Sequence, residues 1–225
     1  MMPGVTNIAA NLARLNERVA RACERCGRSP SEVTLVAVTK TVPVPEIRAA
    51  FSAGIRQFGE NRVQEAETKF GRLTDIRKEI TWHMVGRLQM NKARKTAELF
   101  DVVQSVDSVK LAEALSQRTR KPLPVFLEVN VSGETTKGGF EPDDVAGAVK
   151  IINALPNLEL HGLMTIAPIV NEPGGARPYF RRLRQLRDDF GLKELSMGMT
   201  DDFEAAIEEG ATIIRIGRAI FGERI

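Results

Sequence analysis

The sequence predicts an α/β protein, a single (β/α)8 barrel of the TIM type with an extra helix at its N-terminus. Short apolar stretches alternate with amphipathic stretches, as in parallel strands joined by crossover helices. The predicted strands number eight and are evenly spaced, and eight such units close a barrel. No Gly-x-Gly-x-x-Gly follows the first strand, which argues against the alternative, a doubly wound open sheet. We expect residues 1–225 to form one domain, with residues 1–30 as leading helix and linker.

The first predicted strand, residues 33–40, is an uncharged run of mostly small or β-branched residues that ends in Lys40. Pro43 and Pro45 follow and prevent its continuation as a central strand. A lysine at the end of a buried strand loses hydration. This favours the uncharged amine, which attacks an aldehyde to give a Schiff base. The alternative, a lysine that simply extends from the strand end to solvent, stays open on this stretch alone.

The leading helix is predicted over residues 5–26, because apolar residues recur there at helical spacing up to Gly27. The other predicted strands cover 56–59, 80–86, 101–106, 125–131, 158–166, 194–199 and 212–216. Helices are predicted between them, over 45–53, up to residue 70, and over 91–100, 108–116, 143–154, 178–190 and 201–209, with a last turn over 217–223. This order leaves no linker or low-complexity tract that would divide the chain.

Composition excludes several classes of protein. Hydrophobic residues make up 43% and charged residues 27%, which is typical of a globular domain. No apolar run reaches the length of a membrane span, and no signal-peptide pattern opens the chain, so we expect a cytoplasmic protein without a membrane partner. The net charge is +3, and the basic clusters at 87–95 and 181–187 lack interleaved aromatic residues, which argues against nucleic-acid binding.

The cysteines and histidines do not predict a metal site. Cys23 and Cys26 form a lone Cys-x-x-Cys inside the leading helix, and His83 and His161 lie far from it in the sequence. A structural zinc site needs four ligands at suitable spacings. Two ordinary thiols are therefore the favoured interpretation, and a redox pair is the alternative.

Small and polar residues follow the predicted strands, whose carboxyl ends form the mouth of a barrel, where active sites lie. These ends carry Lys40; Asn61; His83 and Gly86; Ser105 and Asp107; Asn130 and Ser132; Met164 and Thr165; Ser196, Gly198 and Thr200; Arg215, Gly217 and Arg218. The loops after the seventh and eighth strands suit a phosphate. Glycines there expose backbone N–H groups, Ser196 adds a hydroxyl, and a helix N-terminus adds positive potential. Asp201 and Asp202 would repel an anion, so we expect them to point away.

An amine nucleophile opposite a phosphate site suggests pyridoxal 5'-phosphate as the cofactor. Its aldehyde would join Lys40, and its phosphate would occupy the two loops. Arg215 lies two residues before Gly217 on the last strand and therefore projects to the same side. An arginine can donate to the pyridine nitrogen and, because it keeps its own proton, leaves that nitrogen unprotonated.

In these residues and the motifs around them, the chain resembles the pyridoxal-phosphate homeostasis proteins, whose barrel is similar to the N-terminal domain of alanine racemase. The matching motifs cover 36–40, 58–65, 82–89, 130–132, 137–140, 162–164, 196–199 and 215–222. The resemblance implies that Lys40 carries the cofactor as a Schiff base, that Ser196 and the Gly217-Arg218 turn contact the phosphate, and that Arg215 contacts the pyridine. The cofactor-binding residues predicted in this way are Lys40, Asn61, His83, Met164, Ser196, Gly198, Arg215, Gly217 and Arg218.

The chain departs from the family pattern at a few positions. Histidine or proline is more frequent at the position of Arg87, serine at that of Met90, and threonine at that of Arg218. The last difference removes a hydroxyl contact to the phosphate and leaves the backbone N–H of Arg218 to serve.

The resemblance implies a holder of pyridoxal phosphate in intracellular vitamin B6 homeostasis and cofactor supply, with apo-enzymes as recipients and indirect effects on amino-acid metabolism. The alternative is a weak pyridoxal-phosphate-dependent amino-acid racemase in which His83 is the catalytic partner of Lys40; a structural role is the other interpretation of His83. Racemases of this fold take a catalytic tyrosine from an added β-domain of a partner subunit. The sequence ends at Ile225 and its tyrosine, Tyr179, falls in a predicted helix, so we expect no robust activity and a monomer. A scaffold that merely kept the barrel is the third class.

Overall fold

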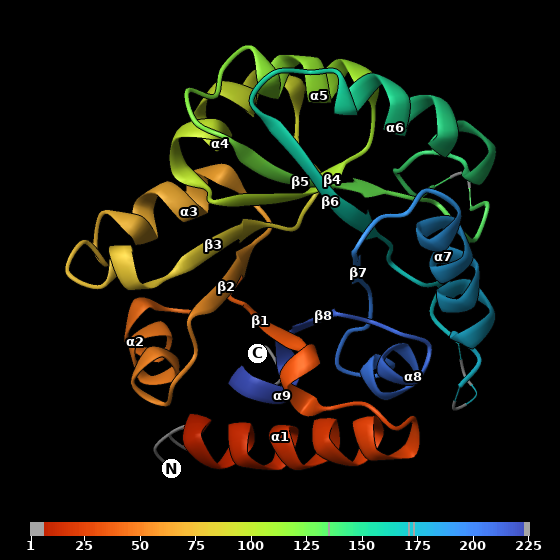
Figure 1. Cartoon of the computed structure of the whole chain (residues 1–225). Helices are drawn as coiled ribbons and strands as arrows, with labels where there is room; N and C mark the ends of the chain where they lie inside the picture. Colours follow the sequence, from red (N-terminus) through yellow and green to blue (C-terminus); the bar gives the residue numbers. More distant parts are fainter. Residues whose placement is uncertain (1–6, 135, 171, 173, 223–225) are drawn as a thin grey trace.

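Parallel strands close into a barrel in the order β1 to β8, with helices around it (Figure 1). The computed structural model describes residues 7–134, 136–170, 172 and 174–222. The strands are β1 Thr34–Val38, β2 Gln57–Glu60, β3 Thr81–Met84, β4 Val102–Val106, β5 Leu123–Glu128, β6 Leu158–Met164, β7 Glu194–Ser196 and β8 Ile213–Ile216. The first strand pairs with the last, with Val36 opposite Arg215, so the sheet has no open edge. The predicted fold class is confirmed.

The leading helix completes the outer ring of helices. The helices are α1 Ile8–Arg25, α2 Val44–Ser52, α3 Val63–Phe70, α4 Ala93–Leu99, α5 Val109–Ser116, α6 Val145–Asn153, α7 Arg177–Asp189, α8 Phe203–Glu208 and α9 Arg218–Phe221. Among the described residues, the element that follows β8 is the four-residue α9, which is too short to cover its strand. Helix α1 contacts α2, α8 and α9 and buries Leu12, Leu15 and Val19 (Figure 1). It therefore stands where an eighth full helix would otherwise lie.

Several elements end earlier than predicted, and the strand ends matter most for the site. Strand β1 ends at Val38 rather than at residue 40, because Val42 N–H donates to Thr39 O and folds Thr39-Lys40-Thr41 into a turn. Strand β7 ends at Ser196 rather than at residue 199, and Gly198 has a left-handed φ of 94°. The predicted helix start at residue 5 and the end of the last turn at residue 223 lie outside the described residues, as does residue 135 of the polar loop after β5.

The apolar core has two parts. The larger part lies between the strands and the helices and includes Phe58, Trp82 and Phe100. The smaller part fills the barrel interior and consists of Val36, Phe126, Met164 and Ile213. The rest of the barrel interior is polar: Gln104, Ser196, His83 and Arg215 are all buried there. A buried polar residue costs free energy unless it is hydrogen-bonded, so these side chains call for a functional or structural account.

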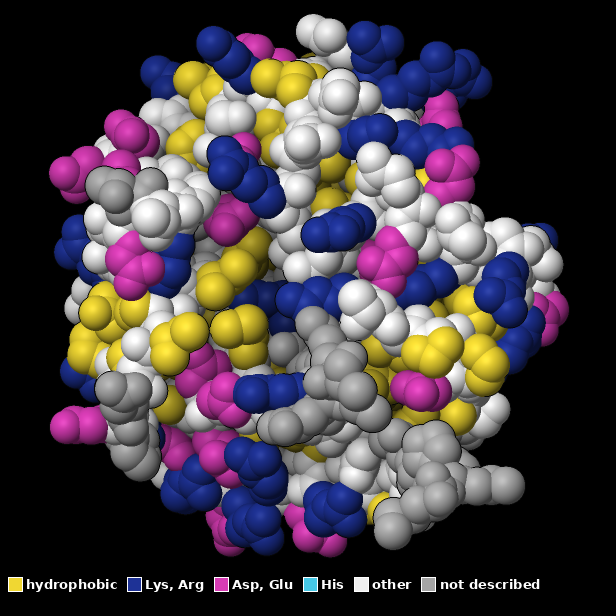
Figure 2. All heavy atoms as spheres, turned by 180° about the vertical axis from the view of Figure 1, so that it is seen from behind, with side chains coloured by type: hydrophobic (Ala, Val, Ile, Leu, Met, Phe, Trp, Pro, Cys, Tyr) yellow, Lys and Arg dark blue, Asp and Glu magenta, His cyan; other side chains and the backbone are white. Residues whose placement is uncertain are grey.

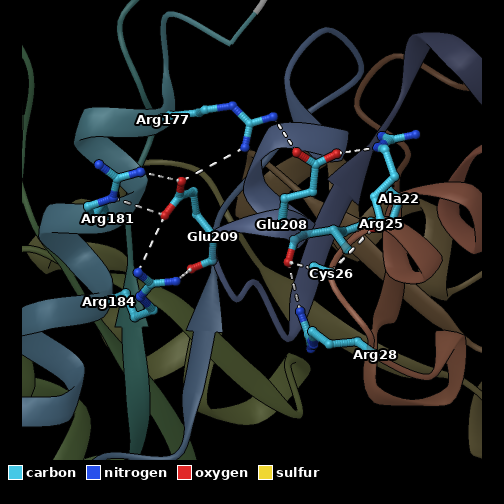
Figure 3. A network of polar contacts seen from close by, with 10 residues as sticks. Ala22, Arg25, Cys26, Arg28, Arg177, Arg181, Arg184, Glu208 and Glu209 are labelled. Atoms are coloured by element: carbon cyan, nitrogen blue, oxygen red, sulfur yellow. Dashed lines mark hydrogen bonds and ion pairs between the residues drawn. The ribbon is translucent and has the colours of Figure 1, made fainter.

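The basic cluster on α7 takes part in an ion-pair network that ties three helices together (Figure 3). Arg181 donates to the buried Glu209 at 2.9 Å, and Arg177 pairs with Glu208. Glu208 also pairs with Arg25 of α1 at 2.6 Å. The network thus links α7, the end of α8 and α1, so Arg181 of the basic cluster at 181–187 has a structural role. Among the residues described, no helix combines the length and the apolar composition that a bilayer crossing needs.

We predict opposite effects of alanine at two glycines. A Cβ at Gly162 of β6 would lie 2.0 Å from the carbonyl oxygen of Glu194 on β7, so Gly162→Ala should lower the free energy of unfolding by about 3 kcal/mol. The control is Gly147→Ala on exposed α6, where no atom lies within 4 Å of the added Cβ; it should raise this free energy by about 0.5–1 kcal/mol. Urea denaturation measures the free energy of unfolding of both variants. Equal stability of Gly162→Ala and the unmodified protein would contradict the predicted clash between β6 and β7.

Candidate functional site

A cavity of about 310 Å³ opens at the carboxyl ends of β1, β2 and β8. Five of the predicted site residues line it together: Lys40, Asn61, Arg215, Gly217 and Arg218. Its other lining residues are Val38, Val85, Ile166, Met199, Thr200 and Asp201. Helix α9, which follows the carboxyl end of β8, lies behind β1 in Figure 1, so the reverse view in Figure 2 looks onto this mouth. Lys and Arg side chains run across the middle of that face, beside hydrophobic ones.

The turn that carries Lys40 is anchored on both sides. Before it, the Nζ of Lys69 donates to Thr39 O at 2.5 Å. After it, the N–H of Thr41, which has a φ of 62°, donates to the carboxylate of Glu65 at 2.6 Å. A non-glycine residue in the left-handed region persists only where its surroundings hold it. The backbone on both sides of Lys40 is therefore fixed by contacts to α3.

These anchors rest on a buried cluster of charges. Lys69 is 7% exposed and pairs with Glu60 and Glu65, each at 2.7 Å. Thr39 donates its hydroxyl to Glu60 at 2.6 Å. Burial raises the pKa of Glu60, although the ion pair with Lys69 acts in the other direction. Removal of Lys69 would leave this carboxyl buried without its cation, which is the costly way to break a buried pair.

Arg215 is the charged group at the centre of the mouth. Its guanidinium donates from Nη1 to Ser196 Oγ at 2.6 Å and from Nη2 to Thr165 O at 2.8 Å. Its backbone N–H donates to Gly198 O at 2.9 Å. Burial lowers the pKa of Arg215 to about 10, with Glu128 and Asp202 as opposing charges. The guanidinium is still protonated at neutral pH and presents only donors to the cavity.

Ser196 lies beneath Arg215 instead of at the mouth. It is fully buried, accepts from Arg215 and donates to Gln104 Oε1 at 2.7 Å. Because β7 ends at Ser196, the mouth begins further along the chain, and Thr200 is the hydroxyl residue that lines the cavity. This geometry corrects the expectation that the Ser196 hydroxyl faces a phosphate.

His83 also lies inside the barrel and outside the cavity lining. It is 4% exposed, and its ring nitrogens contact Gln57 Oε1 at 2.7 Å and Gln104 Nε2 at 2.9 Å. Burial lowers the pKa of His83 to about 4, so the ring is neutral at neutral pH. His83 therefore lies below the mouth where it was expected, and the structural interpretation is favoured over the one in which it transfers protons to a ligand.

Gly198 and Met164 contribute to the site through backbone and packing. A Cβ at Gly198 would lie 2.6 Å from Ala206 Cβ and 2.9 Å from Phe203 Cα, so only glycine lets α8 pack this close. Met164 is fully buried in the apolar layer inside the barrel. Neither residue lines the cavity.

The turn into α9 is the part of the mouth that suits an anion. Gly217 is the N-cap residue of α9, and Arg218 is its first residue. The first turn of a helix offers N–H groups without intrahelical acceptors. Asp201 was expected to point away from the mouth. Instead, it pairs with Arg218, which also lines the cavity. Asp202 accepts from its own turn, from Met199 N–H at 2.6 Å.

Sequence comparison relates this geometry to known proteins. The profile of the alanine racemase N-terminal domain matches residues 10–225. Pyridoxal phosphate homeostasis proteins of Aquifex aeolicus and Pseudomonas aeruginosa are 44% and 46% identical to this chain. The first alignment covers 97% of this chain and 99% of the relative, and the second covers 98% and 97%. The chain belongs to the pyridoxal-phosphate homeostasis protein family.

Solved structures agree with this assignment. PipY of Synechococcus elongatus with pyridoxal phosphate bound is 38% identical, with a TM-score of 0.83 over 96% of this chain and 100% of PipY. An unknown protein from Bifidobacterium adolescentis is 40% identical, with a TM-score of 0.89 over 95% of this chain and 94% of that one. Alanine racemase of Corynebacterium glutamicum, at 20% identity and a TM-score of 0.71, shares the fold, and this chain covers 62% of it.

Two residues of this family member were missed by sequence reasoning. Glu128 ends β5, and burial raises its pKa while Arg215 acts in the opposite direction. Gln104 lies in the middle of β4 and is fully buried. A signal existed for both, because each is a polar residue inside a predicted apolar strand, where polar side chains are uncommon unless they have partners.

We predict that His83 makes stability depend on pH. His83 takes up a second ring proton near pH 6.5 in the unfolded chain and only near pH 4 in the folded chain. The stability that the neutral ring contributes is therefore full above pH 6.5 and is lost as the pH falls toward 4. The unmodified protein should lose about 2 kcal/mol of unfolding free energy relative to His83→Gln between pH 8 and pH 5. In the control His161→Gln, where His83 is intact, the same loss should remain. If denaturant titrations show the same pH dependence for the unmodified protein and for His83→Gln, the predicted role of His83 in this pH dependence is refuted.

Proposed function

We propose that this chain binds pyridoxal 5'-phosphate, holds it as a Schiff base of Lys40, and serves vitamin B6 homeostasis and cofactor supply, with indirect effects on amino-acid metabolism. The observation that carries the proposal is the shared cavity, where Lys40, Arg215 and the Gly217-Arg218 turn meet. PipY, a relative that matches almost the whole chain, has been solved with pyridoxal phosphate bound. When bound, such a cofactor supplies an aldehyde that is reactive toward amines and a ring that withdraws electrons.

The lining of the cavity fits this cofactor in size and in chemistry. About 310 Å³ lies at the small end of the range for small-molecule sites. An amine, a guanidinium, a hydroxyl and a helix start suit an aldehyde, a ring nitrogen and a phosphate. In this arrangement Lys40 would bond the aldehyde carbon, whose oxygen would leave as water. Arg215 would donate to the ring nitrogen, and Thr200 with the Gly217-Arg218 turn would receive the phosphate. Asn61, Val38 and Val85 also line the cavity.

A holder is favoured over a racemase by what lies around Lys40. Racemisation needs a second base opposite the lysine. His83 is buried between Gln57 and Gln104, and Tyr179 of α7 is not among the residues that line the cavity. Asp201, the acidic residue of the lining, is paired with Arg218. We therefore propose a carrier that passes the cofactor to apo-enzymes, acts as a monomer, and works in the cytoplasm, where the free thiols of Cys23 and Cys26 are stable.

We predict that the cofactor attaches to Lys40. Borohydride reduction after incubation with pyridoxal phosphate should leave a cofactor adduct on the Lys40 peptide in mass spectrometry. Lys40→Arg keeps the positive charge but cannot form the Schiff base, so it should lose the adduct and the absorbance band of the complex. Lys110→Ala, an exposed lysine on α5, is the matched control and should keep both. An adduct on another lysine, with Lys40 unmodified, would overturn the proposed attachment.

We also predict transfer without racemisation. The loaded protein should restore the activity of an apo-enzyme, while the exchange of the Cα proton of alanine in D₂O, followed by NMR, should not exceed that of free pyridoxal phosphate. The reason is the missing second base. Exchange well above the free cofactor that disappears in Lys40→Arg would show an enzyme instead of a carrier.

A further inference from the structure

A row of side chains crosses the polar interior of the barrel, from the mouth to the opposite end. It runs through Arg215 of β8, Ser196 of β7, Gln104 of β4, His83 of β3 and Gln57 of β2. The successive contacts measure 2.6 Å, 2.7 Å, 2.9 Å and 2.7 Å. All members but Gln57 are buried. The strands that supply them are distant in sequence, so only closure of the barrel brings the row together.

The chemistry of Arg215 sets the direction of every hydrogen bond in this row. A guanidinium has donors only, so Ser196 Oγ must accept from it. The single proton of Ser196 is then directed to Gln104 Oε1. This fixes the Gln104 amide, whose Nε2 faces His83 Nδ1 and donates to it. His83 must therefore carry its proton on Nε2, from which it donates to Gln57 Oε1.

Reversal of any one bond would disturb all the bonds between it and Arg215. A proton on His83 Nδ1 would face the donor Nε2 of Gln104, and Gln104 would have to turn its amide around. Ser196 would then meet N–H donors from both Gln104 and Arg215, and its own proton would lose its acceptor. In a buried site each unsatisfied polar group costs free energy, so the single direction is strongly preferred.

We infer that Ser196, Gln104, His83 and Gln57 are positioning residues, a one-way hydrogen-bond chain that holds the Arg215 guanidinium against the cofactor ring. The inference rests on the proposed function for the identity of the ligand, but the chain itself belongs to the ligand-free protein. Nη1 is held by Ser196 and Nη2 by Thr165 O, so the guanidinium plane is fixed from two sides. Its remaining N–H groups are left for the cavity, which Arg215 lines.

The inference assigns different roles to two hydroxyl residues, Ser196 and Thr200. The hydroxyl proton of Ser196 is already donated in a hydrogen bond to Gln104, and Ser196 lies below Arg215. Thr200 lines the cavity with Gly217 and Arg218. Ser196 should therefore act on the ring of a ligand through Arg215, whereas Thr200 should act on the phosphate. Pyridoxal, which has the aldehyde and ring but no phosphate, distinguishes the two roles.

The chain is tested first without any ligand, by long-range ¹H–¹⁵N NMR of the histidines at pH 7. The protein has two histidines, so His161→Gln assigns the His83 signals. We expect a neutral His83 with the proton on Nε2 and none on Nδ1. Gln104→Glu keeps the acceptor for Ser196 but offers His83 an acceptor in place of a donor, so it should move a proton onto Nδ1. A proton on Nδ1 in the unmodified protein, or a bare Nδ1 in folded Gln104→Glu, would overturn the chain.

The positioning role is tested next by binding of pyridoxal phosphate and of pyridoxal. Ser196→Ala should raise both dissociation constants by a similar factor of about ten and shift the absorbance of both complexes, since Arg215 loses its partner. Thr200→Val should weaken pyridoxal phosphate and leave pyridoxal unchanged. Ser116→Ala, which removes a buried hydroxyl at the end of α5 that donates to Pro156 O, is the control and should change neither.

Each outcome of the binding test has a distinct meaning. If Ser196→Ala weakens pyridoxal phosphate alone, Ser196 binds the phosphate and the positioning role is refuted. If Ser196→Ala changes neither constant, the chain does not position Arg215, and the role is likewise refuted. If the unmodified protein binds neither compound, the proposed function fails, while the NMR result still decides whether the one-way chain exists.

Discussion

A buried guanidinium that cannot give up its proton dominates the interior of this barrel. Arg215 is 5% exposed, and burial lowers its pKa only to about 10, so the fold must satisfy a permanent charge at its centre. It does so with a hydroxyl, Ser196, a carbonyl, Thr165 O, and the opposing charges of Glu128 and Asp202. These partners explain why the barrel interior is polar where a barrel would otherwise be filled with branched apolar side chains.

A second buried cation, Lys69 of α3, has a different task. Lys69 neutralises Glu60 and Glu65 and, with Glu65, holds the backbone around Lys40. Arg215 thus fixes the part of the cavity wall at β8 through side chains, and Lys69 fixes the neighbouring part, after β1, through the main chain. The backbone that carries Lys40 would otherwise sample many positions, and ordering it in advance would reduce the entropy lost if a ligand binds there.

The sequence was sufficient for the fold class and for the residues that line the cavity through their place after a strand, such as Lys40 and Gly217. Alternation of strands and helices is a local pattern, and the carboxyl ends of parallel strands always meet at one mouth. How far below the mouth a side chain lies is not determined by the local sequence. Ser196 and His83 were expected at the mouth, but β7 ends earlier than its apolar pattern suggests and His83 lies within β3, so both face the interior. Their partner Gln104 is brought near only when β4 closes against the other strands, and no spacing in the sequence encodes that contact.

The polar groups of the site suit the proposed role of holding a ligand. Among the described residues that line the cavity, Lys40, Thr200, Arg215 and Arg218 present donors, and the carboxylate of Asp201 is occupied by Arg218. A group that takes a proton from carbon must have a free lone pair directed at it. The one-way chain removes the obvious candidate, because the lone pair of His83 Nδ1 already accepts from Gln104 and its Nε2 already donates to Gln57. Glu128 retains a raised pKa near Arg215, but it ends β5 outside the cavity lining. In the proposed function, the bonds that fix Arg215 would therefore also withhold His83 as a second base, so the rigidity of the proposed holder and the weak catalysis expected of it would have one physical origin.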